Sequence, residues 1–201
     1  MPLPECEYDP VAWEGQPLDE HYERLGWAPN RLNMIDWITS IAPSSMLDVG
    51  CLDGGNIQRL RQLGFHGTYL GIDITTTFIG KAQRRVPGER FQVGDVRAMD
   101  FGDDDFDLVL VSDVLMHLPV LAPPLQECFR VARDHLLLSI YGSRTETFSR
   151  HGAFLNTSYS RGDVERVVPG RWQVDEFIEF PHPDHGPEHD TAIFQWRIRR
   201  S

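Results

Sequence analysis

Lysine and cysteine are scarce in this chain. Lys81 is its single lysine, against eighteen arginines, which excludes chemistry that needs a second lysine. The three cysteines, Cys6, Cys51 and Cys128, are odd in number and far apart, so the sequence disfavours a disulfide framework and a cysteine zinc site. It has no apolar run long enough to span a membrane, and its acidic, proline-rich start does not resemble a signal peptide. These absences indicate a soluble protein of a reducing compartment, most simply the cytoplasm.

Positive charge is also in short supply. The formal net charge is −11, with 19 basic against 30 acidic residues. Proteins that bind DNA or RNA gain affinity by neutralising phosphates with cations, so this balance disfavours a nucleic-acid partner. The hydrophobic content of 41% and the length of 201 residues predict one globular domain that buries its core without metals or disulfides.

Apolar patterns along the chain alternate between strand and helix. The expected strands cover residues 45–50, 67–74, 90–96, 106–115, 135–142, 172–180 and 191–199. The expected helices cover residues 30–42, 55–65, 76–86, 120–132 and 161–168, with a further short helix near 18–25. Such alternation predicts an α/β fold with a parallel sheet covered by helices on both faces. The last two strands are expected to form an antiparallel pair at the end of the sheet.

Glycines cluster where the first expected strand meets a helix, in "LDVGCLDGG" at residues 47–55. Gly50 permits a tight turn and close approach of a ligand, while Gly54 and Gly55 open the helix, whose free N–H groups favour electronegative atoms. The cluster by itself is a weak signal, and an ordinary strand-to-helix turn is the alternative. Leu52 stands where a middle glycine is usual, and ligand contacts there require that its φ stay negative.

Acidic residues occupy three consecutive strand ends. Asp48 lies inside the first expected strand, where a carboxylate needs a partner such as a cationic ligand group. Asp73 ends the second strand, where it can accept hydrogen bonds from both hydroxyls of a ribose. Asp95 ends the third, where it can accept from an adenine amino group beside the Val96 N–H. Each acid alone is more often a helix cap or turn residue, but the three together favour a nucleotide site.

With these motifs in place, the sequence resembles the class I S-adenosylmethionine-dependent methyltransferases. "LDVGCLDGG" is similar to their first motif, "GIDI" to their ribose-binding acid, and "VGDV" to their adenine-side acid. The resemblance implies a Rossmann-like, doubly wound, seven-stranded and mostly parallel sheet with an antiparallel seventh strand, formed by residues 31–201. It also implies S-adenosylmethionine as cofactor. The implied cofactor-binding residues are Asp48, Gly50, Cys51, Gly54, Asp73, Ile74, Asp95, Val96 and Ser112.

The sequence lacks the motifs of other nucleotide-dependent enzymes and of hydrolases. A nicotinamide-dependent reductase is the main rival, but the chain has neither G-x-G-x-x-G nor a Tyr-x-x-x-Lys pair. It also lacks a G-x-x-x-x-G-K-[ST] phosphate loop, a G-x-S-x-G elbow and an H-E-x-x-H pair.

His117 is the candidate catalytic base. It follows the fourth expected strand in "SDVLMHLP", a turn that in the resembled family faces the methionine end of the cofactor. A near-neutral pKa suits removal of a proton from a hydroxyl or amine, although a packing or capping role for this histidine stays open. Ser112 and Asp113 are expected to line the cofactor through backbone atoms.

Substrate contacts are expected on a long loop at residues 142–161. Arg144, Arg150 and Tyr159 are its candidate substrate-binding residues, with a plain surface loop as the alternative. Residues 1–30 form an N-terminal extension that we interpret as a substrate lid. The histidine-rich stretch 181–190 lacks zinc-ligand spacing, so it is interpreted as a solvated connection and no metal is assigned.

These features predict transfer of a methyl group to an oxygen or nitrogen atom of a small-molecule metabolite. Two alternatives stay open. One is a methyltransferase acting on protein or RNA, and the other is an S-adenosylmethionine-binding domain without catalysis. The oligomeric state is not predicted.

Overall fold

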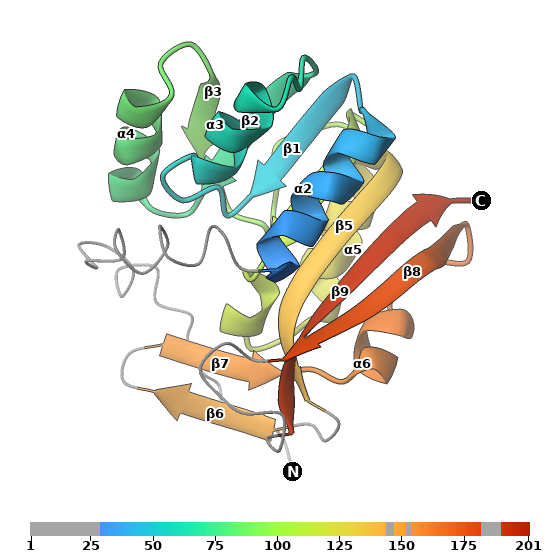
Figure 1. Cartoon of the computed structure of the whole chain (residues 1–201). Coiled ribbons are helices and arrows are strands. Elements are labelled where there is room, and N and C mark those ends of the chain that lie inside the picture. Colours follow the sequence, from blue (N-terminus) through green and yellow to red (C-terminus); the bar gives the residue numbers. More distant parts are fainter. Residues whose placement is uncertain (1–28, 144–146, 152–153, 182–189) are drawn as a thin grey trace.

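The computed structural model describes residues 29–143, 147–151, 154–181 and 190–201. These residues form a central sheet with helices on both faces (Figure 1). Residues 1–28 of the expected lid, which include the helix expected near 18–25 and Cys6, lie outside the described residues, whereas residues 29 and 30 begin a helix. No helix within the described ranges combines the length and the apolar character needed to cross a membrane.

The central sheet has seven strands. In chain order they are β1 (Ser45–Val49), β2 (Thr68–Asp73), β3 (Arg90–Val93), β4 (Phe106–Ser112), β5 (Ala132–Ser143), β8 (Trp172–Pro181) and β9 (Thr191–Arg200). Their spatial order is β3-β2-β1-β4-β5-β9-β8. All neighbouring pairs from β3 to β5 are parallel, whereas β9 runs antiparallel to both β5 and β8. The prediction of a mostly parallel sheet closed by an antiparallel pair is confirmed.

Helices cover the two faces because the residues of each central strand alternate between two cores. The helices are α2 (Pro29–Ile41), α3 (Gly55–Gln62), α4 (Thr76–Arg85), α5 (Ala122–Val131) and α6 (Arg161–Glu165). On one face, Leu110 of β4 belongs to a core with Ile38 of α2 and Ile57 of α3. On the other, the next residue, Val111, belongs to a core with Phe129 of α5. This burial on both faces explains why the sequence of β4 is a nearly continuous apolar run.

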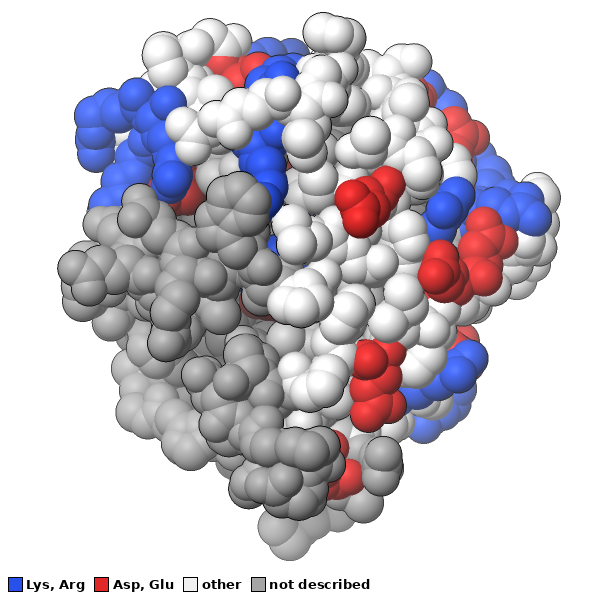
Figure 2. Space-filling view, in the orientation of Figure 1, with Lys and Arg blue, Asp and Glu red and all other residues white. Residues whose placement is uncertain are grey.

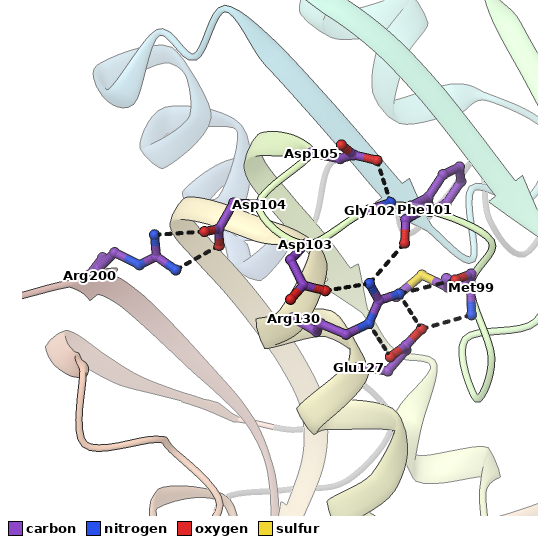
Figure 3. Close-up of polar contacts among 9 residues, drawn as sticks. All are labelled: Met99, Phe101, Gly102, Asp103, Asp104, Asp105, Glu127, Arg130 and Arg200. Carbon is purple, nitrogen blue, oxygen red and sulfur yellow. Dashed lines mark hydrogen bonds and ion pairs between the residues drawn. The ribbon is translucent and has the colours of Figure 1, made fainter.

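An acidic turn precedes β4, at the amino edge of the sheet. The Arg130 guanidinium of α5 donates to Glu127 at 2.7 Å, to Asp103 at 2.8 Å and to two backbone carbonyls of the turn (Figure 3). Arg200 of β9 forms a two-pronged contact with Asp104 at 2.6 and 3.1 Å. These contacts fasten the turn to α5 and β9, so its carboxylates serve the fold.

The loop expected at residues 142–161 contains two strands, which corrects the sequence interpretation. β6 (Thr147–His151) pairs antiparallel with β7 (Phe154–Ser158) as a separate two-stranded sheet. In Figure 1 this hairpin lies below the main sheet, at the end toward which β1 and β5 run. Polar residues interrupt both strands, which hides the apolar alternation by which strands are found in a sequence.

Candidate functional site

A cleft opens at the carboxyl ends of β1, β2, β3 and β4. It encloses about 710 Å³ of empty space, including the open solvent at its mouth. Its lining consists of Arg31, Val49, Gly50, Leu52, Ile72, Asp73, Ile74, Phe78, Gly94, Asp95, Val96, Ser112, Asp113, Val114, His117 and Leu118. The chain leaves β1 toward β2 on one side and later returns to β4 on the other. The cleft therefore lies at the switch point where open α/β sheets bind ligands.

The glycine turn after β1 forms one wall of the cleft. Gly50 has φ +74°, and its N–H donates to the Ile72 carbonyl at 2.8 Å. Leu52 has φ +49°, which contradicts the expectation that its φ stays negative. A leucine in this left-handed region is strained, and such strain persists only where the surroundings hold it. Here the Leu52 N–H donates to Oδ2 of Asp73 at 3.1 Å.

Asp73 organises the next wall. Its Oδ2 accepts from Leu52, and its Oδ1 accepts from both the N–H and the hydroxyl of Thr75 at 3.0 Å. Thr75 in turn caps α4 by accepting from the Phe78 N–H. Asp73 is buried, with 6% of its surface exposed, yet it lines the cleft. One carboxylate thus fixes the glycine turn and the start of α4 on either side of the place predicted for a ribose.

Asp48 does not line the cleft, although it was a predicted cofactor residue. It is fully buried, and its Oδ2 accepts from the Tyr69 hydroxyl at 3.0 Å and from Asn56 Nδ2 at 3.4 Å. Its Oδ1 has no hydrogen-bond partner among the residues that the structure describes. Burial raises the pKa of Asp48 to about 6, while the bonds from Tyr69 and Asn56 and the charge of Arg31 act in the opposite direction. Protein side chains therefore supply the direct partners that were expected from a ligand.

Cys51 and Gly54 also lie behind the cleft lining. Cys51 is 3% exposed and packs in the core beneath α3, where burial raises the pKa of its thiol. Gly54 precedes α3 with φ +78°, and a Cβ at this position would meet the Phe91 ring at 3.0 Å. Both positions thus shape the turn from the protein side and do not border the cleft.

Asp95 and Val96 line the cleft beyond β3. Asp95 accepts from both Nε and Nη2 of Arg97, with a shortest distance of 2.6 Å, and from the Arg97 backbone N–H at 2.9 Å. Partial burial alone would raise the pKa of Asp95, but the hydrogen bonds and charge of Arg97 outweigh it and lower that pKa. Asp95 is therefore an anionic acceptor at the predicted adenine end.

The turn after β4 forms the opposite wall. Ser112 ends β4, and the short 3-10 helix η2 (Leu115–His117) places His117 in the lining. Asp113 has φ +57°, and its Oδ2 lies 2.9 Å from Nη2 of Arg31. Arg31 comes from the first turn of α2, so this ion pair joins two elements far apart in the sequence.

Of the three predicted substrate residues, Tyr159 is the one whose side chain the structure describes, and it is not part of the cleft lining. Tyr159 is 6% exposed, and its hydroxyl donates to the Leu118 carbonyl at 3.0 Å. This bond braces the segment that carries His117, so a structural role replaces the expected substrate contact. Arg144 and residues 182–189 of the histidine-rich stretch lie outside the described residues, as does the side chain of Arg150.

Six of the nine predicted cofactor residues line the cleft together with His117, and sequence reasoning missed other lining residues. In the sequence, Phe78, Val114 and Leu118 are apolar residues without any motif that would indicate a place in a binding site. Arg31 lies on a helix that was recognised by its apolar face alone, so its charge was not weighed. Among the residues described, no group of three or more histidine, cysteine or acidic side chains is arranged to hold a metal ion.

Comparisons with known proteins agree with this geometry. The family described as "Methyltransferase domain" matches residues 47–138. The chain is 33% identical over 127 residues to the phthiotriol/phenolphthiotriol dimycocerosates methyltransferase 1 of Mycobacterium ulcerans, covering 60% of this chain and 46% of that protein. It is 30% identical over 89 residues to a demethylmenaquinone methyltransferase of Roseiflexus castenholzii, covering 43% of this chain and 37% of that protein. The matched region thus spans less than half the length of both relatives.

The fold comparison extends further along the chain. The magnesium protoporphyrin IX methyltransferase of Synechocystis, solved with bound SAH, aligns over 95% of this chain and 91% of its own, with a TM-score of 0.71 and 18% identity. Fold and cleft together define a nucleotide-binding α/β domain. The match over residues 47–138, taken with this fold, supports a class I S-adenosylmethionine-dependent methyltransferase domain.

Proposed function

We propose that this protein transfers the methyl group of S-adenosylmethionine to an oxygen or nitrogen atom of a small-molecule metabolite. The observation that carries the proposal is the placement of Asp73, Asp95 and His117 around one cleft at the carboxyl edge of the sheet. In this proposal the first acid receives the ribose hydroxyls and the second the adenine amino group. His117, on the opposite wall, then faces the reacting end.

The charges of the cleft fit this cofactor. Among the lining residues, the carboxylates of Asp73, Asp95 and Asp113 face one guanidinium, that of Arg31, and Asp48 lies buried behind the glycine turn. Such an excess of negative charge favours a ligand with a net positive charge, as the sulfonium cofactor has. Nicotinamide dinucleotides carry a negatively charged pyrophosphate, which these carboxylates would repel.

The protein's part in the reaction is positioning and proton removal. The cofactor supplies a methyl group already activated by its sulfonium sulfur. With the cofactor bound, the apolar lining of Val49, Ile72 and Leu118 would exclude water, and the polar wall would position the acceptor atom for the transfer. In this proposal His117 accepts the proton of an acceptor hydroxyl or amine, because its ordinary pKa lies near neutrality.

A small-molecule acceptor is supported by the names of the relatives, which refer to demethylmenaquinone and phthiotriol dimycocerosates. A cytoplasmic location belongs to the same proposal. A reducing compartment suits Cys51 and Cys128, which are both free and buried.

Thermal unfolding with S-adenosylmethionine, S-adenosylhomocysteine and NADPH tests the cofactor assignment. We expect both sulfur nucleosides to raise the melting temperature and NADPH to leave it unchanged. A shift with NADPH alone would overturn the proposal. Transfer of a radioactive methyl group to a panel of hydroxylated and amino metabolites then tests catalysis. Cofactor binding without transfer to any metabolite would favour a non-catalytic binding domain.

A macromolecular acceptor is the second candidate, because basic side chains gather locally despite the acidic net charge. Figure 2 shows Lys and Arg at the upper left of the described surface, over the end that holds α4. This helix carries Lys81, Arg84 and Arg85, of which Arg85 is paired with Asp53. A gel-shift titration with RNA at increasing salt tests this candidate. Salt-sensitive binding that Arg84→Ala weakens would favour it over the small-molecule acceptor.

A further inference from the structure

The Arg31–Asp113 pair places a cation and an anion side by side in the cleft wall. Their side chains are 16% and 14% exposed and lie 2.9 Å apart. Both residues line the cleft on the wall that also carries His117. An α-amino-acid group carries a carboxylate and an ammonium on the same carbon, so a fixed cation–anion pair complements it directly.

Asp113 is held in place from β5. Its N–H donates to the Ser139 carbonyl at 2.8 Å, and its Oδ1 accepts from the Ser139 hydroxyl at 2.8 Å. Ser139 is fully buried, so its own side of both bonds is shielded from water. These two bonds hold Asp113 at a φ of +57°, a region that aspartate visits only at a cost in conformational energy.

Arg31 is held in place from β9. Gln195 is fully buried there, and its Nε2 donates to the Asn30 carbonyl at 2.8 Å. Its Oε1 accepts from Asn33 Nδ2 at 2.9 Å. Asn30 and Asn33 flank Arg31 in the first turn of α2, so one amide contacts the helix on both sides of the arginine, through a backbone carbonyl and a side-chain amide. A buried amide is costly unless it is satisfied, which makes this arrangement specific to one position of α2.

The two anchors are neighbours in the sheet. Ser139 and Gln195 are register partners across the antiparallel β5–β9 pair. Partners in register project their side chains to the same face. A single polar position under α2, formed by two adjacent strands, therefore supports both halves of the ion pair.

We propose that Gln195 and Ser139 are positioning residues that hold Arg31 and Asp113 in register with the α-amino-acid end of the ligand. Neither residue lines the cleft, so both act through the pair. The inference rests on the proposed function, because it assigns the amino-acid end of S-adenosylmethionine to this wall.

Two ligands that differ only at that end provide the test. S-adenosylhomocysteine carries the amino-acid group, whereas 5′-methylthioadenosine keeps the nucleoside and sulfur without it. Calorimetry on the full chain measures both affinities for the wild type, Gln195→Met and Ser139→Ala. We expect each substitution to weaken the binding of S-adenosylhomocysteine about tenfold, the scale of one lost hydrogen bond, and to leave that of 5′-methylthioadenosine unchanged. In an Arg31→Met background, Gln195→Met should add no further loss.

Glu176→Ala is the matched control. Glu176 accepts from Trp37 Nε1 at 3.0 Å, so the control also removes a bond between α2 and the sheet, but away from Arg31. It should leave both affinities unchanged. Equal weakening of the two ligands by Gln195→Met and Ser139→Ala, or no weakening, would overturn the positioning role. If the wild type binds neither ligand, the proposed function itself is wrong.

Discussion

The Leu52 N–H donates to Oδ2 of Asp73 at 3.1 Å, which ties the glycine turn after β1 to the end of β2. The same carboxylate accepts twice from Thr75, so it also fixes the start of α4. A residue predicted to hold a ribose is thereby also a structural residue of the turn. Its replacement is expected to affect ligand affinity and stability together.

Asp73→Ala should weaken S-adenosylhomocysteine by roughly 1–3 kcal/mol and lower the free energy of unfolding by a similar amount. The substitution removes an acceptor from the cleft and leaves donors of Leu52 and Thr75 without a partner in a buried place. Calorimetry and urea unfolding measure the two effects. Asp95→Ala is the comparison. The side chain of its partner Arg97 is 46% exposed, so loss of this ion pair should lower the free energy of unfolding by less. Unchanged ligand affinity in Asp73→Ala would refute the ribose assignment.

Leu52 adopts a φ of +49°, so its substitutions should rank by their tolerance of the left-handed region. Leu52→Gly relieves the strain but makes the unfolded chain more flexible, and we expect stability within roughly 1 kcal/mol of the wild type. Leu52→Val should lower the free energy of unfolding by roughly 1–2 kcal/mol, because β-branched residues tolerate this region poorly. Urea unfolding compares the three proteins. A valine variant as stable as the glycine variant would contradict this account of the turn.

The sheet was predictable because each strand carried a local signal. The apolar run of β4 and the polar–apolar alternation of β9 each predict a strand from local sequence alone, without information about the neighbouring strands. Once the strands are predicted, their carboxyl ends are known, and so is the position of Asp73 and Asp95 at the carboxyl edge of the sheet. This is why most of the expected cofactor residues meet at the cleft.

Contacts between distant elements were not predictable in the same way. The Arg31–Asp113 pair joins α2 to the turn after β4, and nothing near either residue in the sequence indicates the other. The partners of Asp48 illustrate the same limit, since the packing of β2 and α3 against β1 is what brings Tyr69 and Asn56 to its Oδ2. The sign of φ at Leu52 depended likewise on Asp73, which is 21 residues further along the chain.

Gly50→Ala should destabilise the protein for two separable reasons. Position 50 has φ +74°, and a Cβ there would lie 2.2 Å from Cγ2 of Val114. We expect a loss of roughly 2–4 kcal/mol in the free energy of unfolding, from backbone strain plus overpacking. In a Val114→Ala background the overpacking part disappears, so the same change should cost only the strain, roughly 1–2 kcal/mol. A double-mutant cycle by urea unfolding measures the difference, and strict additivity would refute the clash.

His117→Ala should lower kcat on the order of 10²–10⁴-fold with an acceptor that the wild type methylates, if the histidine acts as general base. The affinity for S-adenosylhomocysteine should change little, because this ligand lacks the transferred methyl group and the acceptor. His117→Gln preserves much of the side-chain volume and controls for packing. Single-turnover methyl transfer measures the effect. Full activity in either variant would end the assignment, since neither alanine nor glutamine can take up the proton.

The raised pKa of Asp48 predicts how the free energy of unfolding changes with pH. Its pKa is raised from 3.8 to about 6 in the folded protein. Between these values the folded state retains a proton that the unfolded state has released, so this residue lowers stability as the pH rises through the window. Asp48→Asn cannot titrate. The free energy of unfolding of the variant minus that of the wild type should therefore increase by roughly 2–3 kcal/mol from pH 4 to pH 7.

Urea unfolding at several pH values between 4 and 7 measures this difference, and the other titrating groups cancel because the two proteins share them. Asp95→Asn provides a control of opposite sign. The pKa of Asp95 is lowered in the folded state, so its ionised form stabilises the protein above its unfolded pKa, and that contribution is lost as the pH falls. The difference for Asp95→Asn should thus decrease as the pH rises. A flat difference for Asp48→Asn would show that the buried carboxylate stays ionised throughout, with Tyr69 and Asn56 compensating for its burial.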